Sequence, residues 1–380
     1  MKLFKLLTVA LILSSLESCI KKEPLNAECD IISATMPGDI LNRQPVIQND
    51  KVTFIVKNGV SVTDLAPEFE LTPGATIYPP SGSSHNFIIP QHYVVFSEDG
   101  HWEKVYTVEV QTGNNINLDF DFEHVRINNG YDVFYESDKD GNEILTWASG
   151  NAGFKLTGMA SSPDGFPTFQ TDNGRSGKCA ALVTRSTGGF GAMAKKPLAA
   201  GNLFIGKFNI GTALSKPLES TQFGTPFMNV PRYLTGYYQY TPGETYCEAD
   251  GGKLVPVPGK IDKFNIYAVF FEATPDMEML DGTNALSPDN ENIIAVAEIS
   301  DARRVATKTW TEFNIPFVYR NGKEIDLKKL SEGKYSITIV CSSSIDGDYF
   351  SGAIGSTLLV DEVSLVCLSQ DELKPQQSQE

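Results

Sequence analysis

The sequence predicts an all-β protein, with an N-terminal immunoglobulin-like β-sandwich followed by a larger jelly-roll β-sandwich. Short runs in which apolar and polar residues alternate recur along the chain, and Gly- and Pro-rich links separate them. Long stretches with helical periodicity are missing. The 380 residues also exceed what one core usually takes, so two domains are expected.

The first 18 residues have the pattern of a secretion signal. Lys2 and Lys5 form a basic start, and an apolar run over residues 6–13 is too short to span a bilayer. The sequence Leu-Glu-Ser-Cys at 16–19 fits the lipobox of bacterial lipoproteins, which predicts lipidation at Cys19 and a tether over residues 19–30. The alternative is an ordinary cleaved signal with a chance cysteine.

Charge and cysteine content limit the partners. The net charge of −16 repels a phosphate backbone, so nucleic acid is not expected as a partner. Membrane attachment is expected only through the lipid on Cys19. The other five cysteines are odd in number and form no Cys-x-x-Cys pair, which argues against a disulfide framework. Cys341 and Cys367 lie in strand-like runs and are expected to pack as small buried apolar residues.

The first domain is predicted over residues 31–112. Val52, Phe54 and Val56 alternate with other residues, and the run that ends at Val110 alternates in the same way. Turn signals such as Pro73-Gly74 separate these runs. About eighty residues of this kind fit a small immunoglobulin-like sandwich, and no catalytic constellation is visible in it.

The second domain is predicted over residues 116–369, followed by a flexible tail over 370–380. Strands are expected at 118–122, 203–210, 264–271, 293–298, 313–318, 335–341 and 358–368. One short helix is expected at 325–331, closed by Gly333. Many strands with Gly- and Pro-rich links favour a two-sheet jelly roll.

Several stretches of this domain resemble one family of Bacteroidetes lipoproteins. They are residues 200–206, 223–227, 236–243, 266–268, 310–317, and 341–356 continuing to Asp361-Glu362. As a set they are similar to the putative carbohydrate metabolism domain (PCMD) family, in which a preceding immunoglobulin-like module is usual. The resemblance implies a jelly roll similar to carbohydrate-binding modules in a lipoprotein linked with glycan use. It assigns no catalytic residue.

Candidate sugar-binding residues lie mainly in one strand. Sugars bind to flat aromatic faces ringed by amides, carboxylates or guanidinium groups. Tyr238 and Tyr240 fall on one face of a predicted strand, with Arg232 and Gln239 close by. Trp147 is followed by Ser-Gly-Asn, which suggests a part-exposed ring at a loop. The alternative is that the tyrosines belong to the core or to a domain interface.

A hydrolase would need two carboxylates about 5 to 10 Å apart. Candidates are Glu248, Asp250, Glu272, Asp346 and Asp348, and Glu272 is also a candidate ligand contact. No clustered acidic motif selects a pair among them.

The apolar strand at 264–271 needs cover on both faces, from the core on one side and from a loop, the first domain or a ligand on the other.

A structural calcium ion is predicted between the first and last strands of the second domain. If residues 118–123 alternate, Asp121 and Glu123 lie on one face, and hard oxygen ligands suit calcium. The apolar parity of the last strand changes near Asp361, which predicts a bulge at Asp361-Glu362. Jelly-roll modules that the chain resembles often hold calcium between such strands. The alternative is that Asp361 only caps the bulge through backbone hydrogen bonds.

Together these observations predict an outer-membrane-anchored lipoprotein, at the cell surface or on the periplasmic face. Its predicted role is to bind a carbohydrate, as a non-catalytic accessory of polysaccharide capture. One alternative is a glycoside hydrolase on the same jelly roll, and another is an adhesive or structural module with a protein partner. The sequence leaves the glycan unspecified.

Overall fold

A computed structural model describes residues 24–48, 50–57, 60–112, 116–138, 140–320 and 322–368 of the chain. The signal, Cys19 and the tail after 368 lie outside these residues. The described residues form two compact units: one comprises those up to 57 together with 64–111, and the other comprises 60–63 and those from 112 on. Each unit is described by itself.

The first unit is a small β-sandwich. Its strands are β1 (Ile31–Thr35), β2 (Leu41–Gln48), β3 (Lys51–Val56), β4 (Glu68–Leu71), β5 (Thr76–Tyr78), β6 (Gln91–Phe96) and β7 (Glu103–Thr112). Strands β1 and β4 pair in one sheet, and the other sheet has the order β2-β3-β7-β6-β5. Val52, Phe54 and Val56 are fully buried, which confirms the alternation read from the sequence.

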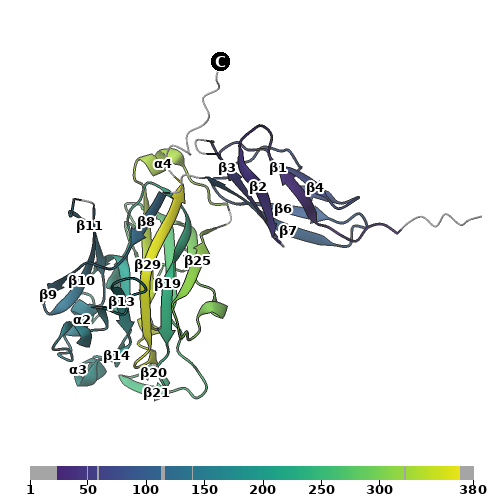
Figure 1. Cartoon of the computed structure of the whole chain (residues 1–380). Coiled ribbons are helices and arrows are strands. Elements are labelled where there is room, and N and C mark those ends of the chain that lie inside the picture. Colours follow the sequence, from purple (N-terminus) through teal and green to yellow (C-terminus); the bar gives the residue numbers. More distant parts are fainter. Residues whose placement is uncertain are drawn as a thin grey trace, which may run out of the picture. The chain divides into compact units, whose positions relative to one another are not determined.

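The second unit is a larger two-sheet β-sandwich (Figure 1). Its small sheet has the order β12-β13-β29-β19-β25, with β8 paired to β29. Its large sheet has the order β26-β24-β22-β27-β16-β11-β10-β9. The strands are β8 (Ile116–Phe120), β9 (Val125–Asn128), β10 (Tyr131–Ser137), β11 (Glu143–Ala148), β12 (Thr168–Thr171), β13 (Cys179–Val183), β14 (Arg185–Ser186), β15 (Leu198–Ala199), β16 (Asn202–Phe208), β17 (Thr221–Phe223), β18 (Thr225–Pro226), β19 (Val230–Thr241), β20 (Tyr246–Asp250), β21 (Lys253–Pro256), β22 (Asn265–Glu272), β23 (Leu280–Asp281), β24 (Ile293–Glu298), β25 (Thr311–Pro316), β26 (Val318–Tyr319), β27 (Tyr335–Ser342), β28 (Gly352–Ala353) and β29 (Thr357–Leu368).

Helices are few and short in the described part of the chain. They are α2 (Asn151–Lys155), α3 (Gly188–Met193) and α4 (Leu327–Ser331), with 3-10 turns η2 (Pro163–Gly165), η3 (Pro217–Glu219), η4 (Asp301–Arg303) and η5 (Gly347–Tyr349). Helix α4 confirms the predicted helix, because Asp326 caps it by accepting the backbone N–H groups of Lys328 and Lys329. Among the described residues, no helix has the length and apolar character needed to cross a membrane.

The all-β class and the two-sandwich architecture are as predicted. Cys341 and Cys367 are buried, as expected for small apolar residues. The predicted bulge near Asp361 is also present: Thr235 pairs with Ser364 and Tyr237 with Asp361, so Gly236 alone faces two residues of β29. Glu362 has a positive φ of 47° at this point.

Candidate functional site

The face of the large sheet that turns away from the small sheet carries a hollow. Side chains alternate along β22 and the residue before it, so Phe264 and Ile266 face the small sheet, where Phe264 contacts Tyr238 and Tyr240. Tyr267, Val269 and Phe271 face the other way, in a cluster covered in part by Leu280 and Ala285 of the following loop. A loop therefore covers most of the second apolar face, and the Tyr267 end remains next to a pocket.

The strand register builds the floor of this pocket. Val340 of β27 pairs with Phe204 of β16 on one side and with Tyr267 of β22 on the other, and Tyr267 pairs with Glu298 of β24. Directly opposed residues point to the same face, with Cβ atoms about 5 Å apart. The four side chains therefore form one row across four strands.

A second row lies beside the first and is polar. Ser342 pairs with Asn202 and with Asn265. The Asn265 amide donates to Glu298 Oε1 over 3.1 Å and its carbonyl oxygen accepts from Arg304, which also donates to Glu298 over 2.5 Å. We call the cavity over these two rows, about 160 Å³ in volume, the polar pocket.

Asp348 stands on the wall of the polar pocket, on the 3-10 turn η5. The segment that carries it is anchored by Asp262, which is 1% exposed. Asp262 Oδ2 accepts hydrogen bonds from the hydroxyls of Ser344 and Ser356 and from the backbone N–H of Ala353, at 2.6 to 2.7 Å. The buried Asp262 carboxylate therefore holds both ends of the segment 344–356, which contains Asp348.

Asp348 is unusual among the acidic residues of this pocket. Its side chain reaches solvent through the hollow, and no hydrogen bond or ion pair to it is found within the described residues. Although the residue is exposed, the protein atoms around it partly desolvate the carboxyl, which raises its pKa to about 6. Burial, followed by the negative charges of Asp348 and Glu298, raises the pKa of Tyr267 well above its ordinary value. Both carboxylates therefore lie close enough to Tyr267 to act on it.

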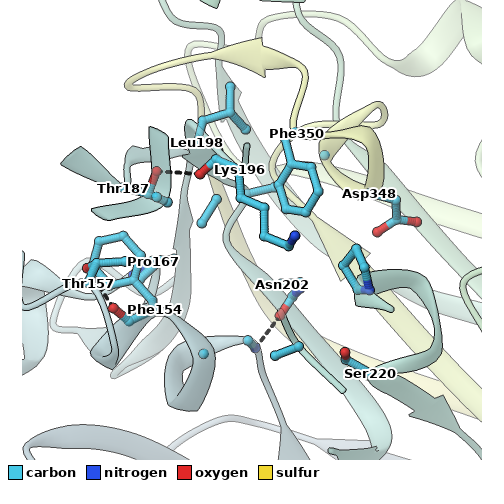
Figure 2. Close-up of a pocket in the computed structure, with 18 of the residues that line it drawn as sticks. Phe154, Thr157, Pro167, Thr187, Lys196, Leu198, Asn202, Ser220, Asp348 and Phe350 are labelled. Atoms are coloured by element: carbon cyan, nitrogen blue, oxygen red, sulfur yellow. Dashed lines mark hydrogen bonds between the residues drawn. The ribbon is translucent and has the colours of Figure 1, made fainter. Parts of the chain in front are cut away.

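A second cavity, about 140 Å³ in volume, adjoins the polar pocket; we call it the apolar pocket (Figure 2). The lining includes Phe154 on α2, Phe190 on α3, Leu218 on η3 and Phe350 after η5. Asn202, Thr221, Ser342 and Asp348 line both cavities, so the two are adjacent. The Asn202 side chain lies in the middle of Figure 2, between Phe154 and Asp348.

The predicted sugar-binding tyrosines lie elsewhere, in the core between the two sheets. Tyr238 and Tyr240 share one face of β19, as expected, but each is only 1% exposed and packs on Phe264. Their hydroxyls donate to the backbone carbonyls of Arg303 and Ser343. A buried ring has no free face to offer a ligand, so the structure favours the core alternative.

The other predicted ligand contacts do not converge. Trp147 is 2% exposed, not part-exposed, because its ring points into the core and its indole N–H donates to Glu136. Arg232 is also buried, and Gln239 is half-buried and donates to the Lys308 carbonyl. Glu272 pairs with Lys329 at the far end of β22, about 23 Å along the strand from Asn265. None of these residues lines either of the two pockets.

The predicted calcium ligands are engaged by backbone amides. Strand β8 ends at Phe120 and Phe122 has a positive φ of 56°, so the expected alternation stops before Asp121. Asp361 is fully buried and its Oδ2 accepts from the backbone of Arg175 at 2.6 Å and of Ser176 at 3.3 Å. In the same turn, Glu123 accepts from the backbone of Lys178.

Because these carboxylate oxygens already accept backbone N–H groups, they do not form a shared set of oxygen ligands for an ion. In the described part of the chain, no three acidic, His or Cys side chains are grouped so as to hold a metal. The carboxylates do not fit a common calcium site in this arrangement. Burial raises the pKa of the Asp361 carboxyl, and the hydrogen bonds from backbone N–H groups partly oppose this shift.

Of the residues that line the polar pocket, only Asp348 was named from the sequence as a candidate site residue. It was one of five candidate carboxylates, and no motif selected a pair among them. A signal was nevertheless present. Asn202, Phe204, Phe223, Tyr267, Ser342 and Asp348 all fall inside the stretches that carry the family resemblance. Those stretches are far apart in sequence, and they meet at this pocket.

Comparisons with known proteins agree with the architecture. Residues 121–366 match the family model described as "Putative carbohydrate metabolism domain", and residues 31–110 match "SGBP, N-terminal". A crystal structure of a putative glycoside hydrolase from Bacteroides thetaiotaomicron is 46% identical, with a TM-score of 0.63, over 92% of this chain and 99% of that one. A putative glycoside hydrolase from Bacteroides vulgatus is 45% identical, with a TM-score of 0.61, over 66% and 98%. No match was found among curated proteins.

Proposed function

Because the chain belongs to the putative carbohydrate metabolism domain family, we propose that it binds a glycan in the polar pocket. The observation that carries this proposal is the convergence of the family-like stretches on one hollow lined by amides, hydroxyls and carboxylates. The protein would act as a lipid-anchored accessory of polysaccharide capture. The match of residues 31–110 to the N-terminal domain of surface glycan-binding proteins supports a position at the cell surface.

The groups around the polar pocket suit a sugar. Phe223 and Tyr267 contribute apolar atoms to the lining, against which C–H groups of a sugar can pack. The amide nitrogen of Asn202 has no hydrogen-bond partner among the described residues, while its Oδ1 is held by the backbone N–H of Gly150. That amide can donate to a hydroxyl or ring oxygen, and the Asp348 carboxylate can accept from a sugar hydroxyl.

Binding tests this proposal directly. The purified full-length protein without its signal is screened on a glycan array, and hits are measured by calorimetry. Asp348→Asn and Tyr267→Phe change groups of the pocket without removing packed volume, and each should weaken binding about tenfold. Glu312→Gln, an exposed carboxylate on β25 in the small sheet, is the matched control and should bind normally. Normal binding by both pocket variants would rule the pocket out.

A second function, glycoside hydrolysis, is favoured by one specific observation. The polar pocket holds two carboxylates whose surroundings differ: Asp348 has its pKa raised to about 6, and Glu298 is paired with Arg304. Glycosidases use such a pair, with one carboxylic acid to protonate the leaving oxygen and one carboxylate as base or nucleophile. Asp348 would be the acid and Glu298 the carboxylate.

Hydrolysis has a distinct signature. The acid must be protonated, so turnover should fall as the pH rises through about 6. The array hits are incubated with the protein at pH 5 and pH 8, and released reducing ends are measured. Asp348→Asn and Glu298→Gln should each abolish release. Binding without release at either pH would leave the protein a non-catalytic binder.

A further inference from the structure

The two pockets adjoin each other, which raises the question of what fills the apolar one. Asn202 and Asp348 line both cavities, so a ligand held in the polar pocket lies beside the apolar pocket. Deepening the proposed function, we infer that the ligand is a glycan with a small apolar substituent, such as an aromatic aglycone or a short acyl chain. Its sugar occupies the polar pocket and the substituent occupies the apolar pocket.

Three polar side chains that line the apolar pocket already make hydrogen bonds within the protein. The hydroxyl of Thr157 donates to the Phe154 carbonyl over 2.7 Å, and that of Thr187 donates to the Lys196 carbonyl (Figure 2). Lys196 Nζ donates to the Leu214 carbonyl over 2.9 Å. A second sugar ring would therefore find few free donors for its hydroxyls, while an apolar group needs none.

Apolar side chains also form the mouth of this pocket. Phe190 is 39% exposed, Leu214 is 50% exposed and Leu156 is 43% exposed, and all three line the cavity. A ligand that removes apolar surface in a hollow from water gains binding free energy. Because these residues come from three separate segments, the hollow is a feature of the fold and not of one loop.

The size of the apolar pocket limits the substituent. A cavity of roughly 150 Å³ holds one benzene-sized ring, and the apolar pocket measures about 140 Å³. A lipid tail or a peptide segment needs more room. The unpartnered amide of Asn202 lies at the junction, where the glycosidic oxygen or the ester carbonyl that links sugar and substituent would lie.

The probes for this inference are pairs of methyl and 4-nitrophenyl glycosides of the same sugar, over a panel of common pyranoses in both anomers. For any sugar that binds, the 4-nitrophenyl glycoside should bind at least tenfold more tightly, because each buried methylene-sized group is worth roughly fourfold in affinity. The double variant Phe190→Ser, Leu214→Ser changes only partly exposed rim residues and should remove most of that difference. Met193→Ser is the matched control, because Met193 lies on the same helix and is 79% exposed.

The outcomes separate this inference from the proposed function. If methyl and 4-nitrophenyl glycosides bind equally, or the rim variant keeps the full difference, the inference is wrong and glycan binding stands. Binding of 4-nitrophenol alone as tightly as its glycosides would mean an apolar ligand without a sugar, which also overturns the inference. If neither the glycosides nor any array glycan binds, the proposed function itself fails.

Discussion

Glu136 is a carboxylate enclosed by aromatic side chains. It is 6% exposed, accepts the indole N–H of Trp147 at 2.9 Å, and lies where Trp147 packs against Phe120 and Phe122. Burial, followed in part by the charge of Asp121, raises its pKa to about 7, although the Trp147 bond opposes the shift. The core therefore favours the protonated acid.

The raised pKa makes stability depend on pH. In the unfolded chain the carboxyl ionises near 4.5, so the contribution of Glu136 is fully present below that pH and is lost as the pH rises to about 7. The loss is about 1 to 3 kcal/mol. Glu136→Gln keeps an acceptor for Trp147 and cannot ionise, so its Tm at pH 8 should exceed that of the wild type, with little difference at pH 4.5.

Thermal melts from pH 4.5 to pH 8 measure this effect, with Glu312→Gln as the exposed control. The control should follow the wild type. If Glu136→Gln loses stability with pH as steeply as the wild type, other groups govern the dependence.

At the scale of single residues, the calcium prediction depends on Asp361. Its oxygens accept backbone N–H groups of residues 175, 176 and 362, which accounts for the carboxylate without an ion. The calcium ion stays a prediction. If it binds, calcium at a hundred times its Kd adds about 2.7 kcal/mol, which shifts Tm by roughly 5 to 11 °C. Melting after long incubation in EDTA or in millimolar calcium tests this, and an unchanged Tm with no metal by elemental analysis removes it.

Among the strands, β19 and β29 show how tightly the sandwich core is fitted. Gly236 of β19 lies opposite the bulge of β29. A Cβ built on it would lie 2.7 Å from Phe313 Cζ and 3.0 Å from Val363 Cα. Only a residue without a side chain fits between the neighbouring strands at this position.

Gly236→Ala should therefore destabilise the second unit by about 1 to 3 kcal/mol, because overpacking forces neighbouring strands apart. Gly189→Ala is the control: a Cβ there meets open space on helix α3, and alanine favours a helix. Denaturant melts of both variants make the comparison. A Gly236→Ala midpoint equal to that of the wild type would mean that the bulge absorbs the added methyl.

The elements were predictable from the sequence where alternation was strong. The predicted strand at 293–298 matches β24, and the parity change near Asp361 correctly located the bulge. Alternation failed after Phe120, because a residue with positive φ ends the strand there. It placed Tyr238 and Tyr240 on one face, but alternation alone does not say which face another sheet covers.

The pocket was not predictable because its floor depends on strand pairing. Phe204, Tyr267, Glu298 and Val340 become one row only when four strands adopt one register. Strand order β24-β22-β27-β16 differs from sequence order, and local patterns do not specify it. Trp147 misled for a related reason, since its polar neighbours indicate a loop while its own ring faces the core.

At the scale of the whole molecule, charge limits which glycans the proposed site could bind. The chain carries −16 overall, and Asp348 and Glu298 add negative charge inside the polar pocket. Sulfated or uronate-rich glycans would be repelled by this field, so neutral or amino sugars fit better. The same field matters at the membrane, since it gives an anionic lipid surface no electrostatic reason to attract the protein.

The lipobox predicts that a covalent lipid on Cys19 attaches the protein to a membrane. This residue lies outside the described part of the structure, so its lipidation is a prediction from the lipobox. Cys19→Ala should release the protein from the membrane fraction and abolish labelling by a palmitate analogue, because it removes the thiol that would carry the lipid. Cys29→Ala, ten residues further along and half-buried, is the matched control and should stay membrane-bound and labelled. Labelling that persists in Cys19→Ala would place the lipid elsewhere or point to a different anchor.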